Sequence, residues 1–160
     1  MGRPVVLWIS RHLPLPSQIR ELDRILGDYE LKIHNTDECP LPTAQHAAEL
    51  AVRQRADIVV PVLPLSFVIH LIEEARKRGF TVVKAHMQTL HNCETQPCLE
   101  YDPDKDTIVV SKDKATGEKI YRHFRFVEFR IVDDIIVRWR PFTRRNLRRI
   151  RLAKATKQDI

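Results

Sequence analysis

Residues 58–85 read IVVPVLPLSFVIHLIEEARKRGFTVVKA, and this stretch decides the fold. Residues 58–63 are rich in apolar, β-branched side chains, which predicts a buried strand. From Leu65 to Arg78 the apolar side chains recur every three or four residues, which predicts a helix, and Gly79 is typical of a helix end. The apolar run Phe80–Ala85 predicts a second strand. A strand, a helix and a strand joined by such short connections predict two parallel strands of one sheet.

The same alternation continues toward the N-terminus. Val5–Ile9 predicts a strand that is covered on both faces, and Ser17 and Gly27 predict the start and the end of a helix. Tyr29–His34 alternates as a half-exposed strand does, and Thr43 predicts the cap of another helix. The residues expected to face inward on these two helices are Ile19, Leu22, Ile25, Leu26, Ala47, Leu50 and Ala51. The order predicts an α/β protein with a Rossmann-like open parallel sheet and right-handed crossovers.

The second half of the chain predicts antiparallel pairing. Thr107–Ser111 and Lys119–Ile131 are strand-like and are separated by a glycine-containing turn, and Asp133-Asp134 predicts a turn into a further strand, Ile135–Trp139. The sequence leaves open whether these strands extend the parallel sheet or form a separate layer. We expect three parts: an α/β core at residues 1–90, a loop and antiparallel extension at 91–142, and a basic tail at 143–160.

Length and composition favour one globular protein. The chain has 160 residues, of which 43% are hydrophobic and 30% charged, which is too small for two enzyme domains and outside the disordered and collagenous classes. No apolar run reaches the roughly 20 residues that span a bilayer. The three cysteines, Cys39, Cys93 and Cys98, are too few for a disulfide framework. We therefore expect a cytoplasmic protein with reduced thiols and no membrane partner.

Positive charge is concentrated at the C-terminal end. Residues 138–160 carry nine Lys and Arg and one acid, a net charge of +8, whereas residues 1–137 carry a net charge of −2. This asymmetry indicates an anionic partner for the tail, or else a solubilising segment. For a tail that binds nucleic acid, the candidate residues are Arg144, Arg145, Arg148, Arg149 and Arg151. Binding to phosphates would weaken with added salt.

The predicted strand ends carry polar groups suited to an anionic ligand. Ligands of open α/β sheets bind outside the carboxyl ends of the strands. Ser10-Arg11-His12 follows the first strand, Asn35 follows the second, and Ser66 follows the third and is expected to cap a helix. The G-x-G-x-x-G and P-loop patterns are absent, which disfavours ordinary NAD and ATP sites. The alternative is a set of polar loops that only cap helices.

A histidine and cysteine cluster lies just after the fourth predicted strand. His86, His91, Cys93 and Cys98 are a chemically adequate set for structural zinc, although their spacing is unlike a paired C-x-x-C motif. Ordinary loop residues are the alternative. Farther along, His123 lies on a strand where basic and aromatic residues alternate, which suits either a half-buried strand or contact with a nucleotide.

Ile9-Ser10-Arg11-His12, the later Gln18, and Val60-Pro61-Val62-Leu63-Pro64 resemble small Rossmann-like proteins of CRISPR systems, the CARF-type cyclic-oligoadenylate sensors and ring nucleases. The resemblance covers about the first 90 residues. It implies a homodimer that binds a cyclic oligonucleotide across its two-fold axis. The residues it places at the ligand are Ser10, Arg11, His12, Gln18, Pro64 and Ser66.

The same resemblance implies a reaction: cleavage of the phosphodiester by the neighbouring ribose 2′-hydroxyl, without a metal or other catalytic cofactor. Arg11 would stabilise the developing charge and His12 would transfer protons. Two alternatives stay open. One is a non-enzymatic nucleic-acid-binding or assembly protein that uses the basic tail, and the other is an enzyme for a different nucleotide or phosphorylated metabolite in the same cleft.

Overall fold

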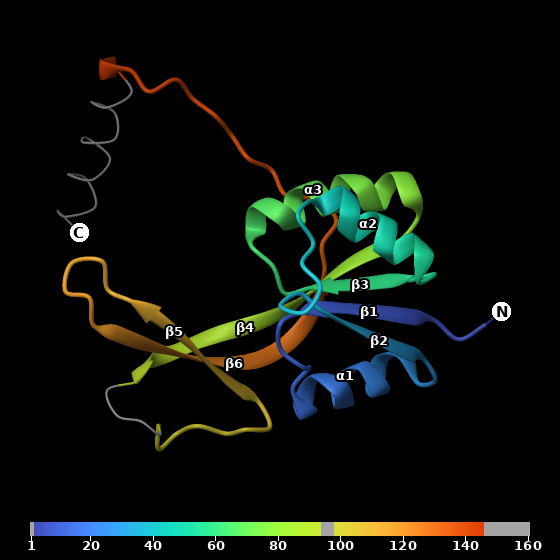
Figure 1. The fold of residues 1–160 in the computed structure, drawn as a ribbon, viewed down its shortest axis with the longest axis horizontal. Helices are drawn as coiled ribbons and strands as arrows, with labels where there is room; N and C mark the ends of the chain where they lie inside the picture. Colours follow the sequence, from blue (N-terminus) through green and yellow to red (C-terminus); the bar gives the residue numbers. More distant parts are fainter. Residues whose placement is uncertain (1, 94–97, 146–160) are drawn as a thin grey trace, which may run out of the picture.

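The computed structural model describes residues 2–93 and 98–145 and shows an α/β protein built on one mixed sheet (Figure 1). The sheet has the strand order β2-β1-β3-β4-β6-β5. Along the described chain, the elements are β1 (Val5–Ser10), α1 (Pro16–Leu26), β2 (Glu30–Asn35), α2 (Ala44–Arg53), β3 (Ile58–Pro61), α3 (Leu65–Arg78), β4 (Thr81–Cys93), β5 (Asp106–Lys112) and β6 (Lys119–Ile131). The α/β class is therefore confirmed, but the sheet as a whole is mixed and curled, not an open parallel sheet.

The parallel part of the sheet is built around β1. This strand pairs in parallel with β2 and β3, and β3 pairs in parallel with β4. Figure 1 shows α1 on one face of the sheet and α2 and α3 on the other. The side chains of β1 alternate between the two faces of the sheet. Leu7 and Ile9 belong to the core cluster under α2 and α3. Val6 and Trp8 lie in a second cluster, which includes Leu26 of α1. Burial on both faces explains why β1 is continuously apolar.

The helix ends follow local chemistry, with two corrections. Thr43 caps α2 as predicted, since its hydroxyl accepts the His46 backbone N–H at 3.3 Å, and Gly27 and Gly79 end α1 and α3. The predicted caps Ser17 and Ser66 are wrong. Leu15 and Pro64 hold the capping positions instead. Proline residues suit a helix start because the first turn needs no N–H from them, so each helix begins before its serine.

The buried face of helix α1 is narrower than predicted. Gln18 and Leu22 are buried and Leu26 packs against the core, so the inward residues repeat every four positions. Ile25, which we expected to face inward, is 50% exposed at the rim of this face.

The fourth strand is longer than the sequence pattern predicts. β4 pairs with β3 through Thr81 and Val82 and then continues, antiparallel to β6, as far as Cys93. The pairing has register irregularities at His86/Met87 and Thr89/His91. The expected end at Ala85 is wrong because β6 supplies hydrogen-bond partners to the polar residues that follow it. We call residues 83–93 of β4 together with β5 and β6 the antiparallel ribbon; it extends the main sheet.

The predicted strand Ile135–Trp139 does not form in the structure. The ribbon ends where the Val132 N–H donates to the Val82 carbonyl at 2.9 Å, and residues 133–143 adopt no helix or strand. Strand-like composition alone is insufficient, because a strand needs an adjacent edge with which to pair. In the part of the chain described, no helix is both long enough and apolar enough to cross a bilayer.

Candidate metal centre and candidate ligand edge

Four side chains at the far end of the antiparallel ribbon converge on one point. His91 and Cys93 lie near the end of β4, His123 lies opposite His91 in β6, and Cys98 follows β4 in the chain. Their ligand atoms all lie within 4.8 Å of one another. Nε2 of His91 is 3.3 Å from Sγ of Cys98 and 3.8 Å from Sγ of Cys93. The distance from Cys98 Sγ to Nδ1 of His123 is 3.6 Å. This cluster could hold a metal ion.

A buried carboxylate contacts one of these imidazoles at the ring nitrogen that faces away from the cluster. His123 Nε2 lies 2.7 Å from Oδ2 of Asp106, and both side chains are fully buried. Arg125 donates to both oxygens of that carboxylate, from Nε at 2.7 Å and from Nη2 at 2.9 Å, and the Asp102 backbone N–H donates to it at 2.9 Å. The Arg125 guanidinium therefore holds the pKa of Asp106 well below its usual range, despite the opposing effect of burial.

The second imidazole also faces an acid. Nδ1 of His91 lies 3.5 Å from a carboxylate oxygen of Glu100. Each histidine thus presents one ring nitrogen to the cluster and the other to a carboxylate. This is the usual arrangement around metal-binding histidines, whose second nitrogen is oriented by an outer partner.

The structure brings together three of the four predicted metal ligands and replaces the fourth. His86 is not in the cluster, since it pairs with Glu128 in the ribbon, five positions before His91. Five residues of extended strand span about 16 Å, so both imidazoles cannot reach one ion. The sequence pattern predicts the end of the strand at Ala85, which would leave His86 in a loop. The fourth member of the cluster is His123, whose signal in the sequence was only a histidine on a predicted strand.

Two residues of the predicted ligand edge lie at the carboxyl ends of β1 and β2. Ser10 and Asn35 are the last residues of these strands and are paired in register. Ser10 is 2% exposed, and its hydroxyl accepts the His12 backbone N–H at 3.0 Å. The Trp8 indole N–H donates to the His12 carbonyl at 3.2 Å, which fixes the loop. Arg11 and His12 themselves are exposed.

The other predicted ligand residues have structural roles or lie at the surface. Gln18 is buried, and its Oε1 accepts the Leu15 backbone N–H at 2.8 Å while its Nε2 lies 3.8 Å from Sδ of Met87. Pro64 caps α3, and Ser66 is exposed in the first turn of that helix. The Gln18 side-chain oxygen therefore closes the start of α1 from a buried position.

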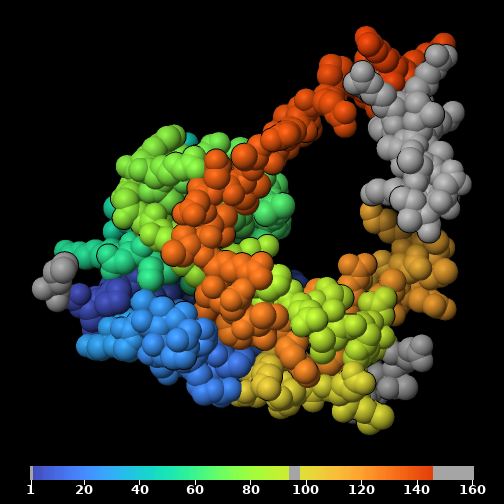
Figure 2. Space-filling view, turned by 180° about the vertical axis from the view of Figure 1, so that it is seen from behind, coloured from blue at the N-terminus to red at the C-terminus, as the bar shows by residue number. Residues whose placement is uncertain are grey.

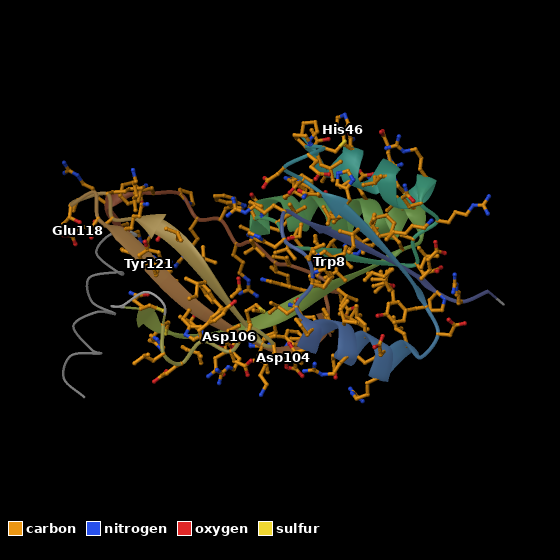
Figure 3. All side chains as sticks on the ribbon, turned by 60° about the horizontal axis from the view of Figure 1, so that its bottom comes forward. Trp8, His46, Asp104, Asp106, Glu118 and Tyr121 are labelled. Carbon is orange, nitrogen blue, oxygen red and sulfur yellow. The ribbon has the colours of Figure 1, made fainter. Side chains whose placement is uncertain are left out.

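A pocket of about 430 Å³ lies elsewhere, between α1 and the antiparallel ribbon. Its lining residues are Ser17, Glu21, Gln88, Lys105, Arg125, Phe126 and Val127. It includes none of the predicted ligand residues. Figure 3 shows Asp104 and Asp106 at the start of β5 beside α1, and Arg20 of α1 donates to Asp104 there.

Of the basic residues predicted to contact nucleic acid, Arg144 and Arg145 are exposed. Arg148, Arg149 and Arg151 lie outside the described residues.

Comparison with known proteins found no matching family model, no matching curated protein and no matching solved structure.

Proposed function

We propose that His91, Cys93, Cys98 and His123 hold a structural zinc ion. Zinc bound to two thiolates and two imidazoles is tetrahedral, and its bond lengths place neighbouring nitrogen and sulfur ligands about 3.6 Å apart. Three of the four nitrogen–sulfur separations in the cluster are 3.3, 3.6 and 3.8 Å, and the fourth, between Cys93 and His123, is within 4.8 Å. This agreement is the observation that carries the proposal. Thiolate and imidazole ligands also favour zinc over magnesium or calcium.

Four protein ligands would leave no open position for water or substrate, so the role of this zinc is structural. The ion would join the end of β4, the segment at Cys98 and the first half of β6. Zinc binding would thereby stabilise the far end of the ribbon, where the exposed strands have little apolar core of their own.

The test is metal analysis of the full-length protein, with Cys98→Ser compared with Cys39→Ser. Cys39 is exposed and outside the cluster, so it is the matched control. We expect one zinc per chain in the wild type and in Cys39→Ser, and less than one in Cys98→Ser. A wild-type protein that binds no zinc from a zinc-containing buffer would overturn the proposal.

We also propose that the edge at Ser10, Arg11, His12 and Asn35 binds a cyclic oligoadenylate or a related nucleotide, and that β1–β4 with α1–α3 form a Rossmann-like unit. The supporting observation is the placement of Ser10 and Asn35 side by side at the carboxyl ends of neighbouring parallel strands. The strand order changes direction at β1, with β2 on one side and β3 on the other. Such a reversal is where open α/β sheets bind ligands.

Cleavage at this edge would follow from the same groups. The ribose 2′-oxygen attacks the adjacent phosphorus, a 2′,3′-cyclic phosphate forms, and the bond to the 5′-oxygen breaks. His12 would accept the 2′-hydroxyl proton or supply the proton that the 5′-oxygen takes up, and Arg11 would stabilise the charge on the phosphoryl oxygens. No redox cofactor is needed.

This second proposal is tested with cyclic tetra- and hexa-adenylate in the presence of EDTA. We expect binding and linear products from the wild type, lost product in His12→Ala and weaker binding in Arg11→Ala. Arg53→Ala and His70→Ala are matched controls, because both side chains are exposed on helices outside the edge. Unchanged binding and cleavage in both Arg11→Ala and His12→Ala would overturn it.

A further inference from the structure

The chain leaves the folded body at a well-defined point after β6. Arg76 of α3 donates to the Asp133 carbonyl at 2.6 Å and lies 3.3 Å from a carboxylate oxygen of Asp134. Ile135 packs against the core cluster under α2 and α3. Beyond this anchor, Figures 1 and 2 show the orange segment running away from the body. We call residues 136–145 the C-terminal arm.

The C-terminal arm exposes large apolar side chains. Ile136 is 74% exposed, Trp139 88% and Phe142 87%. Residues 136–143 adopt no helix or strand, so no amphipathic face explains the pattern. Exposed aromatic side chains gathered on one projecting segment indicate a surface that contacts another molecule.

The same residues carry a dense positive charge. Arg138, Arg140, Arg144 and Arg145 are exposed, and the arm contains no acidic residue. The two aromatic rings therefore lie among guanidinium groups along a short extended stretch. Aromatic rings that stack on bases, combined with cations that contact phosphates, are how proteins bind single-stranded nucleic acid without strong sequence preference.

We propose that the C-terminal arm binds single-stranded nucleic acid, with Trp139 and Phe142 stacking on bases and Arg138 and Arg140 contacting phosphates. Charge favours this partner over a second copy of the chain. The arm carries four positive charges, whereas residues 1–137 carry a net charge of only −2. The continuing sequence adds five more Lys and Arg before Asp159, which suits a polyanion. This site is separate from both the metal cluster and the strand-end nucleotide site.

The experiment uses the two tryptophans of the full-length protein. Trp139 is 88% exposed, whereas Trp8 is 2% exposed and serves as an internal reference. Titration with an oligouridylate of about 20 nucleotides should quench the exposed fluorescence and leave the buried component. Trp139→Ala should abolish the quenching. With the binding followed by a label on the RNA, it should also weaken affinity about 5- to 150-fold, the usual effect of losing one stacked base.

Salt dependence tests the charged groups separately. The double variant Arg138→Gln with Arg140→Gln should reduce the slope of log affinity against log salt by about 1.4, since each phosphate contact with a single strand contributes about 0.7. Val110→Ala is the matched control, because Val110 is also an exposed apolar residue but lies on β5. It should leave affinity, quenching and slope unchanged.

Two outcomes would overturn the proposal. One is unchanged RNA affinity in the combined Trp139→Ala and Phe142→Ala variant. The other is a wild-type oligomer, seen by sedimentation, that dissociates in this variant while RNA binding persists. The arm would then bind a second copy of the chain instead of RNA. Arg11→Ala should bind the oligouridylate normally, so failure here is distinguishable from failure of the cyclic-nucleotide proposal.

Discussion

The imidazole of His123 is held by the carboxylate of Asp106, with Nε2 and Oδ2 only 2.7 Å apart and both side chains fully buried. An ionised carboxylate accepts hydrogen bonds, so Nε2 carries the proton. In the neutral imidazole the lone pair then lies on Nδ1, which faces Sγ of Cys98, 3.6 Å away. Arg125 and the Asp102 backbone N–H satisfy the rest of the carboxylate, so the imidazole is held facing the cluster.

Removing the charge of Asp106 should therefore weaken metal binding without removing a ligand. We expect Asp106→Asn to lower zinc affinity about 10- to 100-fold, the usual consequence of changing an outer partner of a metal-binding histidine. Competition against a chromophoric chelator measures this change.

Asp104→Asn is the matched control for that variant. Asp104 lies in the same segment and pairs with Arg20 at the surface, where solvent screens the ion pair. Its zinc affinity should equal that of the wild type. Equal affinities in Asp106→Asn and Asp104→Asn would show that the buried carboxylate does not orient a ligand.

Cobalt substitution can show which of two histidines, His123 or His86, binds the metal. In the cobalt-substituted protein, His123→Ala should change the ligand-field absorption, because a metal-bound nitrogen is lost. His86→Ala should leave the spectrum unchanged, because His86 pairs with Glu128 far along the ribbon. The reverse result would restore the ligand set expected from sequence spacing.

This difference shows why the sequence identified most, but not all, of the cluster. His91, Cys93 and Cys98 are close in the chain, and local spacing is enough to group them. His123 joins them only because β6 pairs with β4 in the register that places it opposite His91. Cross-strand register depends on contacts between distant segments, and no local pattern encodes it.

The glycine at the end of α3 leads to a prediction about stability. Gly79 has a φ of +81°, and a Cβ atom placed on it would meet no atom within 4 Å. Gly79→Ala therefore introduces backbone strain without a steric clash, and we expect the free energy of unfolding to fall by about 1–2 kcal/mol. Urea denaturation measures this, with Gly2→Ala, which has no positive φ, as the control. A loss of stability as small as that of the control would mean that the end of α3 relaxes.

Helix ends and strand extents differ in how well the sequence predicts them. Gly79 and Thr43 act through their own backbone or side chain, and both predictions are confirmed. The extent of β4 and the absence of a strand at residues 135–139 depend instead on whether β6 or another edge lies alongside. Periodicity measures the capacity of a segment to form a strand, and pairing decides whether the strand forms.

The last prediction concerns alkaline pH. Burial, with a smaller contribution from the hydrogen bond that the Tyr29 hydroxyl donates to Asp23 at 2.9 Å, raises the pKa of Tyr29 from 10.0 to about 12. The folded protein thus favours the neutral phenol, so the stabilisation is fully present below pH 10 and is lost as the pH rises toward 12. Tyr29→Phe has no proton to lose at this position. Above pH 10 the unfolding free energy of the wild type should therefore fall relative to that of Tyr29→Phe. Other groups that titrate at alkaline pH are present in both proteins, so their effects cancel in the difference. A difference that stays constant over this range would show that the phenol ionises equally easily in the folded and unfolded chains.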